Sequence, residues 1–268
     1  MKNRRLFLTT GVAALALGSA GFCIAQQAPD GSKFVGTWKE NPAKRTLGAQ
    51  PPLRFQAAAN GGLEELRGPE VRPLVQPVQF GAKAYSVDKS SNMIEWKKVD
   101  SNHFERRLYE SGKLLSTRKI EVSKDGSTLT EVTERSPSDI RTAVFKRNTS
   151  GGQGLAGVWK AESMRGTPEQ IKIERLGAQG VRVTSDRGMI RTLTFDGKSN
   201  PVAGPAVLSG TADAAKLKSP DTIEVAMSRE GVASNTVTLV LSADGRTLTQ
   251  TSKRNSDGQT SVTVFDKQ

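Results

Sequence analysis

An internal repeat is the sequence feature that most limits what this chain can fold into. The stretch SKDGSTLT at residues 123–130 returns as SADGRTLT at residues 242–249, a shift of 119 positions along the chain. Near the start of each copy, GTWK at residues 36–39 matches GVWK at residues 157–160. Matches that keep the same order through a unit of this length indicate that the chain contains two copies of one ancestral segment.

The length of the repeat decides between two kinds of repeat protein. A unit of roughly 120 residues is far longer than a propeller blade or a solenoid repeat, and it is long enough to be a domain. We therefore expect one domain at residues 32–147 and a second at residues 155–268. Residues 148–154, with the sequence NTSGGQG, are expected to form a flexible Gly/Ser-rich linker between them.

The first 25 residues are expected to form a cleaved signal peptide. A basic segment, MKNRR, precedes the apolar segment LFLTTGVAALALGSA, which is too short to span a membrane. Arg4 and Arg5 before Phe7 and Leu8 are typical of a twin-arginine export signal, and the general secretory route stays open as well. The expected location is periplasmic or secreted, and no other segment has the roughly 20 apolar residues of a membrane span.

Few residues in the chain could support catalysis or metal binding. Cys23 is the only cysteine and is expected to leave with the signal peptide, and His103 is the only histidine. A site of two histidines, or of cysteine and histidine, is therefore excluded within one chain. Glu64 and Glu65 are adjacent on a predicted strand and point to opposite faces, so they cannot flank one bond. We predict no catalytic, cofactor-binding or metal-binding residues, and a hydrolase is the least favoured class.

The charge balance favours weak contacts with acidic partners. The chain has 39 Lys and Arg residues against 27 Asp and Glu residues, a formal net charge of +12. Such a surface can associate weakly with acidic polymers of the cell envelope. The basic residues are interleaved with acids, and aromatic residues make up only 5% of the chain, too few for base-stacking surfaces. Specific nucleic-acid binding is not expected.

The local pattern predicts antiparallel strands. Apolar and polar residues alternate in TIEVAMS at residues 222–228 and in TVTLVL at residues 236–241, which is the period of a half-buried strand. The Asp-Gly pairs inside SKDGSTLT and SADGRTLT indicate the same hairpin turn in both copies. Each copy is therefore expected to be an antiparallel β-domain, and both a barrel and a sandwich would protect its strand edges.

Three motifs together resemble the lipocalin and calycin families. These are the two Gly-x-Trp motifs (Gly36 and Trp38, Gly157 and Trp159), the repeated hairpin, and the terminal VFDKQ. The resemblance implies two tandem lipocalin-like barrels, each with its tryptophan packed across the base and its glycine in a structural role. The lipocalin Thr-Asp-x-x-Tyr motif is missing, so the resemblance does not extend to a particular ligand, and it implies no cofactor.

The favoured function is binding of a small amphipathic or anionic molecule, because a small barrel can hold one such ligand. The alternative is a cell-envelope protein that binds acidic glycans or another protein. Candidate ligand-binding residues are Phe104, Arg106 and Leu108, which share one face of a predicted strand in the first copy. Ile223, Val225 and Met227 are the inward positions of the second copy.

Arg106 distinguishes the two copies. It aligns with Val225 of the second copy, and Arg118 aligns with Val237. A cation on an inward face is costly, so Arg106 must meet a carboxylate, reach solvent at the barrel mouth, or bind an anionic ligand such as a fatty acid. The third outcome would place a ligand site in the first copy only.

Overall fold

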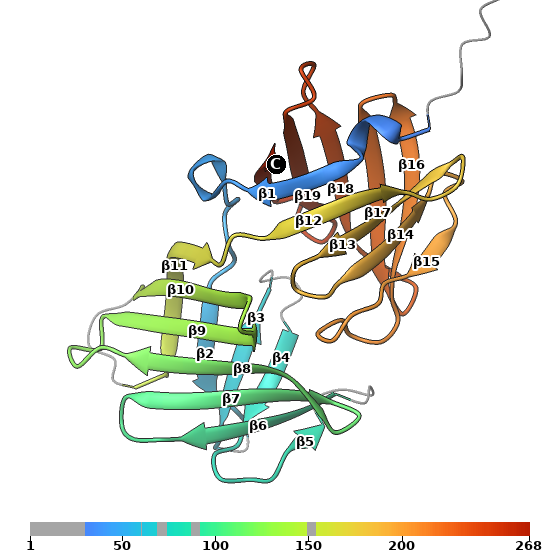
Figure 1. Ribbon diagram of the computed structural model, residues 1–268. Helices are drawn as coiled ribbons and strands as arrows, with labels where there is room; N and C mark the ends of the chain where they lie inside the picture. Colours follow the sequence, from blue (N-terminus) through green and yellow to red (C-terminus); the bar gives the residue numbers. More distant parts are fainter. Residues whose placement is uncertain (1–29, 60, 69–73, 87–91, 149–153) are drawn as a thin grey trace, which may run out of the picture.

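The computed structural model describes residues 30–59, 61–68, 74–86, 92–148 and 154–268. The predicted signal peptide lies outside the described residues, as does most of the predicted linker. Within the described part, the chain forms two ten-stranded antiparallel sheets and two 3-10 helices, η1 (Ser32–Phe34) and η2 (Pro42–Lys44) (Figure 1). The predicted all-β fold is confirmed.

The two sheets are named here by the copy that supplies most of their strands. The C-terminal barrel has the strand order β14 (Ile190–Thr194), β13 (Gly180–Ser185), β12 (Gln170–Arg175), β1 (Gly36–Glu40), β20 (Thr260–Lys267), β19 (Thr247–Arg254), β18 (Val232–Leu241), β17 (Thr222–Arg229), β16 (Thr211–Ser219), β15 (Ser199–Pro201). The N-terminal half-barrel has the order β4 (Leu74–Val78), β3 (Leu63–Arg67), β2 (Leu53–Ala57), β11 (Gly157–Gly166), β10 (Asp139–Arg147), β9 (Thr128–Ser136), β8 (Lys113–Val122), β7 (His103–Glu110), β6 (Asn92–Lys98), β5 (Tyr85–Ser86).

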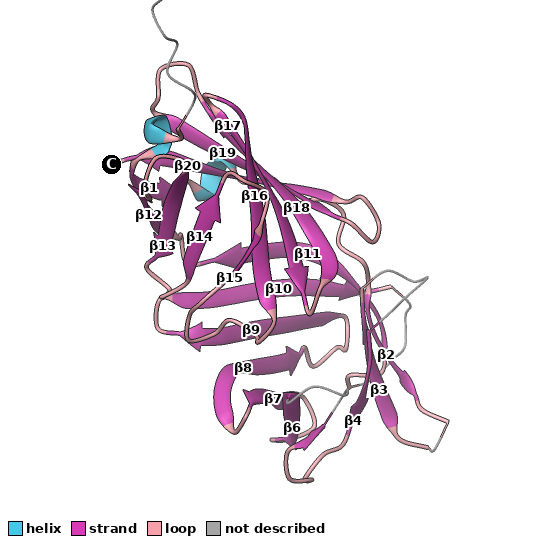
Figure 2. Ribbon diagram, turned by 90° about the vertical axis from the view of Figure 1, so that its right-hand side faces the viewer, coloured by secondary structure: helices cyan, strands magenta, loops and turns pink. Residues whose placement is uncertain are grey.

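The two sheets differ in how far they close. In the C-terminal barrel, Ile190 at the start of β14 and Ala203 after β15 exchange two backbone hydrogen bonds of 2.8 and 3.0 Å. An ion pair of 2.8 Å between Arg191 Nη1 and Asp213 Oδ2 joins β14 to β16 across the same seam. In the N-terminal half-barrel, β2 to β4 and β6 to β10 form two walls of an open curve (Figure 2). One continuous curved sheet in each case decides for a barrel-like fold over a sandwich.

The first strand of each copy lies in the sheet of the other copy. β1 pairs with β12 and β20 in the C-terminal barrel, whereas β11 pairs with β10 and β2 in the N-terminal half-barrel. Figure 1 shows this exchange as a blue strand among the yellow and red strands of the barrel. The sheets therefore differ from the expected ranges 32–147 and 155–268 by one reciprocal exchange of strands.

The exchanged strands occupy equivalent sites. The indole Nε1 of Trp38 donates to the carbonyl of Phe34 at 2.9 Å, and that of Trp159 donates to the carbonyl of Leu155 at 2.8 Å. Both tryptophans are fully buried, each in the hydrophobic core of the sheet that receives its strand. The nearly identical segments GTWK and GVWK therefore make the same contacts, each in the sheet of the other copy.

Backbone conformation and steric contacts explain the glycine of the Gly-x-Trp motif. Gly36 has φ 149° and Gly157 has φ 140°, a backbone region that L side chains rarely adopt. A basic side chain from the last strand of the domain covers each indole ring, and a Cβ on the glycine would come within 3.0 Å of Lys267 or 2.5 Å of Arg147. A side chain at either position would strain the backbone and displace the basic group that covers the ring, so glycine suits both positions.

The repeated hairpin is confirmed in both copies. Between β8 and β9, the amide of Ser123 donates to the carbonyl of Thr128 at 2.9 Å, and Gly126 has φ 69°. Between β18 and β19, the amide of Ser242 donates to the carbonyl of Thr247 at 2.9 Å, and Gly245 has φ 68°. The Asp-Gly pair therefore makes the same turn twice, because only glycine adopts this left-handed backbone without strain.

Candidate functional site

A cavity of about 360 Å³ lies inside the C-terminal barrel. It exists because inward positions on the barrel strands carry mid-sized aliphatic side chains, while larger groups such as Trp38 and Phe34 pack in the core outside its lining. The apolar part of the lining consists of Ile171, Ile173, Val183, Met189, Leu193, Val225, Met227, Val237, Leu239 and Phe265, with Pro205, Ala206 and Val207 from the loop before β16.

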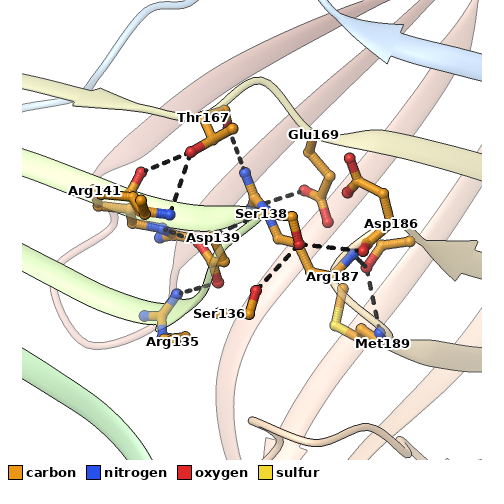
Figure 3. A network of polar contacts seen from close by, with 12 residues as sticks. Arg135, Ser136, Ser138, Asp139, Arg141, Thr167, Glu169, Asp186, Arg187 and Met189 are labelled. Atoms are coloured by element: carbon orange, nitrogen blue, oxygen red, sulfur yellow. Dashed lines mark hydrogen bonds and ion pairs between the residues drawn. The ribbon is translucent and has the colours of Figure 1, made fainter.

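The mouth of the cavity lies at the junction of the two sheets. Four residues of β9 and β10 belong to the cavity lining, although these strands belong to the N-terminal half-barrel; they are Arg135, Ser136, Asp139 and Arg141. They face Glu169 and Arg187 of the C-terminal barrel (Figure 3). The half-barrel thus supplies one side of the cavity in the neighbouring barrel.

Asp139 organises the charges at this mouth. Its carboxylate accepts a hydrogen bond from Arg135 at 3.0 Å and one from Arg141 at 3.3 Å, and it lies 3.6 Å from Arg187 Nε (Figure 3). Burial would raise the pKa of Asp139, but Arg135, Arg141 and Arg187 outweigh burial and lower that pKa. Asp139 is therefore held as a carboxylate.

Glu169 has fewer donor partners than Asp139. One of its oxygens lies 3.3 Å from Arg187 Nη1, while its buried Oε1 has no hydrogen-bond partner in the described part of the chain. Burial raises the pKa of Glu169, and Arg187 and Arg141 oppose that rise without cancelling it. The mouth therefore contains a carboxylate oxygen that still lacks a donor.

Arg141 has hydrogen-bond donors that could complement the free acceptor of Glu169. Its Nε is bound to Asp139, whereas its two terminal nitrogens donate no hydrogen bond to any described residue. A donor and an acceptor are thus available at the mouth of an apolar cavity. This combination of apolar wall and a few polar groups is typical of small-molecule sites.

The three candidate ligand-binding residues of the first copy lie together on β7, on the inner face of the N-terminal half-barrel. Phe104 belongs to the hydrophobic core, and Leu108 packs against that core. Arg106 is buried at 6% exposure, where its Nη2 donates to Gln76 Oε1 at 2.8 Å and its Nε lies 3.7 Å from Glu65 Oε2. Of the outcomes expected for Arg106, the structure shows contact with a carboxylate.

Arg106 and four other charged residues form a cluster, which we call the ion cluster. Its members are Glu65 on β3, Arg67 at the end of β3, Arg106 on β7, Arg118 on β8 and Glu131 on β9. Sequence reasoning considered Glu65 only for catalysis and missed Glu131 altogether. The available signal was strand parity, since Glu131 shares the inward face of β9 with the fully buried Leu129.

The expected inward residues of the second copy are divided between two roles. Val225 and Met227 line the cavity, whereas the fully buried Ile223 packs in the core outside the lining. The structure therefore shows its cavity in the second copy, whereas sequence reasoning considered a ligand chiefly for the first.

The described residues include neither a candidate group of metal ligands nor a helix able to cross a membrane. No group of three His, Cys, Asp or Glu side chains within that part of the chain is placed to hold a metal ion. No helix there has the length and apolar character to cross a membrane. His103 begins β7 as an exposed side chain, with its Nδ1 2.8 Å from Asp100 Oδ2.

No protein-family model matches the chain, and no curated protein matches its sequence. The chain is an all-β protein of two similar, ten-stranded, barrel-like antiparallel sheets, and the cavity of its C-terminal barrel is its candidate ligand site.

Proposed function

We propose that this protein binds a small amphipathic molecule in the cavity of the C-terminal barrel and acts as a binding protein rather than as an enzyme. The observation that carries the proposal is the cavity itself. At about 360 Å³ it has the size of a site for one small ligand, at the lower end of the usual range of roughly 300–1,000 Å³.

The cavity suggests how such a ligand would lie. Most of the barrel wall around Val225 and Val237 is aliphatic or aromatic, although Asn235, Gln250 and Ser252 also line the cavity, so the apolar part of the ligand would lie against the apolar side chains. Arg141 and Glu169 at the mouth offer an unused donor and an unused acceptor, so the polar end would lie between the two sheets. The ligand would then hold both sheets together.

The resemblance to lipocalins supports the same proposal. The Gly-x-Trp motifs, the barrel-like sheets and the tryptophans at the core agree with a lipocalin-like origin of both copies. On this proposal the C-terminal barrel has kept an internal ligand space, whereas the N-terminal half-barrel carries the ion cluster beside the apolar side chains of its core.

The proposal is tested by filling the cavity with a larger side chain and measuring the binding of an apolar dye. N-phenyl-1-naphthylamine, an apolar dye whose fluorescence rises in dry surroundings, is titrated into the full chain. Val237→Phe places a ring in the cavity and is expected to weaken dye binding at least tenfold. Val232→Phe is the matched control, since it adds the same ring to an exposed position of the same strand. Equal dye binding by a folded Val237→Phe variant and the unmodified protein would contradict the proposal.

A further inference from the structure

The ion cluster of the N-terminal half-barrel has more cations than anions. Three guanidinium groups, of Arg67, Arg106 and Arg118, surround two carboxylates, of Glu65 and Glu131. The strongest electrostatic influences on Arg106 come from the other four members of the cluster. The cluster therefore has one uncompensated positive charge, and Arg106 is its most buried cation.

Two of the arginines use both carboxylates. Arg67 bonds to Glu65 and to Glu131, and Arg118 Nη1 donates to Glu65 at 2.7 Å while its Nε lies 3.5 Å from Glu131. Arg106 is left with the neutral amide of Gln76 and a long contact of 3.7 Å to Glu65. The buried Nε atoms of Arg106 and Arg118 have no hydrogen-bond acceptor in the described chain. The surplus cation is thus also the one with the poorest partners.

The strand register brings the two incompletely bonded arginines side by side. Arg106 on β7 and Arg118 on β8 are directly opposite each other in the antiparallel ladder. Like charges at directly opposed positions destabilise a sheet, and a buried unpaired charge costs several kcal/mol. Burial, followed by Arg118, accordingly lowers the pKa of Arg106 to about 10.

We propose that the N-terminal half-barrel binds a small oxyanion, a carboxylate or a phosphate, between Arg106 and Arg118. Such an anion would supply the missing negative charge and accept hydrogen bonds from the two guanidinium groups, which match carboxylate and phosphate oxygens in geometry. The open side of the half-barrel gives access, because Arg67 is 30% and Arg118 14% exposed along their side chains. This site is separate from the cavity of the C-terminal barrel and does not depend on the function proposed for it.

Thermal unfolding of the full chain with inorganic phosphate, at constant ionic strength, tests the site. We expect the unfolding midpoint of the half-barrel to rise by about 4 °C once phosphate is in roughly tenfold excess over its dissociation constant. Arg106→Leu should abolish this rise, since it removes the surplus charge. Glu131→Gln should enlarge the rise, since it increases the surplus.

Arg107→Leu is the matched control, because Arg107 is the next residue on β7 and its outward side chain pairs with Glu105 at 2.7 Å. The control removes the same net charge and should keep the full phosphate effect. A rise that persists unchanged in Arg106→Leu, or that is absent from the unmodified protein, would overturn the proposal.

A second measurement needs no variant. In nitrogen-15-labelled protein, the Nε–H resonances of Arg106 and Arg118 should move during a phosphate titration while that of Arg107 stays in place. Acetate and butyl phosphate, titrated in parallel, distinguish the sources of the anion. Equal shifts with inorganic and butyl phosphate indicate a free anion, and a much tighter response to butyl phosphate indicates the head of a larger molecule. No shift with any of the three anions would rule out the site.

Discussion

The interiors of the two sheets differ at equivalent positions. In the C-terminal barrel, Val225 and Val237 line a cavity, whereas in the N-terminal half-barrel the equivalent positions carry Arg106 and Arg118 of the ion cluster. Short aliphatic side chains leave room that long guanidinium groups occupy, and those groups need carboxylates close by. The same framework of strands therefore supports either a ligand space or an ionic core, and the choice depends on a few inward residues.

Both sheets have a buried tryptophan on the exchanged strand. Removing either tryptophan should have the largest effect on stability. Trp38→Ala and Trp159→Ala should each cost roughly 3–5 kcal/mol of unfolding free energy, the usual cost of emptying a large aromatic site. The effects should be crossed because of the strand exchange. Hydrogen exchange read by mass spectrometry should speed up in β12 and β20 for Trp38→Ala, and in β2 and β10 for Trp159→Ala. Faster exchange confined to the copy that carries the mutation would contradict the exchanged arrangement.

A change in the ion cluster should have the next largest effect on the free energy of unfolding. Glu65→Gln should destabilise the half-barrel by about 3 kcal/mol, because removing one partner of a buried ion cluster leaves its cations uncompensated. Glu64→Gln on the same strand is the control and should stay near the unmodified protein. Urea titration monitored by circular dichroism measures both variants. A cost for Glu65→Gln as small as that for the control would mean that the ion cluster does not stabilise the half-barrel.

Lowering the pH should affect the stability of the two sheets differently. Burial would raise the pKa of Glu65 and of Glu131, but the surrounding arginines outweigh it and lower both pKa values from the usual 4.5. These groups therefore stabilise the folded state above pH 4.5, and that stability is lost as the pH falls through the lowered pKa values.

In the C-terminal barrel, buried carboxyl groups should make the stability depend on pH in the opposite direction. Burial raises the pKa of Asp213, against the opposing effect of Arg191, and burial likewise raises the pKa of Glu169. Their contribution to stability is fully present at low pH and is lost as the pH rises through the raised pKa values. Hydrogen exchange at falling pH should therefore show the half-barrel opening before the barrel. The reverse order would contradict this assignment of the ionic groups.

Local features of the fold followed from the sequence. The strand period and the Asp-Gly turns depend on neighbouring residues, and parity correctly placed Phe104, Arg106 and Leu108 on one face of β7. The charge partners of Arg106 could have been found in the same way. Glu131 lies on the inward face of β9, and only its distance along the chain concealed that it meets Arg118.

The strand exchange was outside the reach of sequence reasoning for a physical reason. GTWK and GVWK have the same glycine, tryptophan and lysine, so the motif itself does not distinguish the two sheets. The choice is made by how the connecting segments run between the sheets, which no local pattern encodes. The cavity was also hidden, since its existence depends on the summed volumes of side chains from five or more strands.

The exchange of first strands also sets an order of events during synthesis. β1 is among the earliest structured parts to leave the ribosome, yet one of its two neighbours, β20, is the last strand to be made. The half-barrel has all its strands once residue 166 has been added, whereas the C-terminal barrel must wait for residues 260–267. Such distant pairing folds slowly, because a long loop must close before the contact is made. The newly made chain should therefore hold one finished sheet and one unfinished sheet until its final strand arrives.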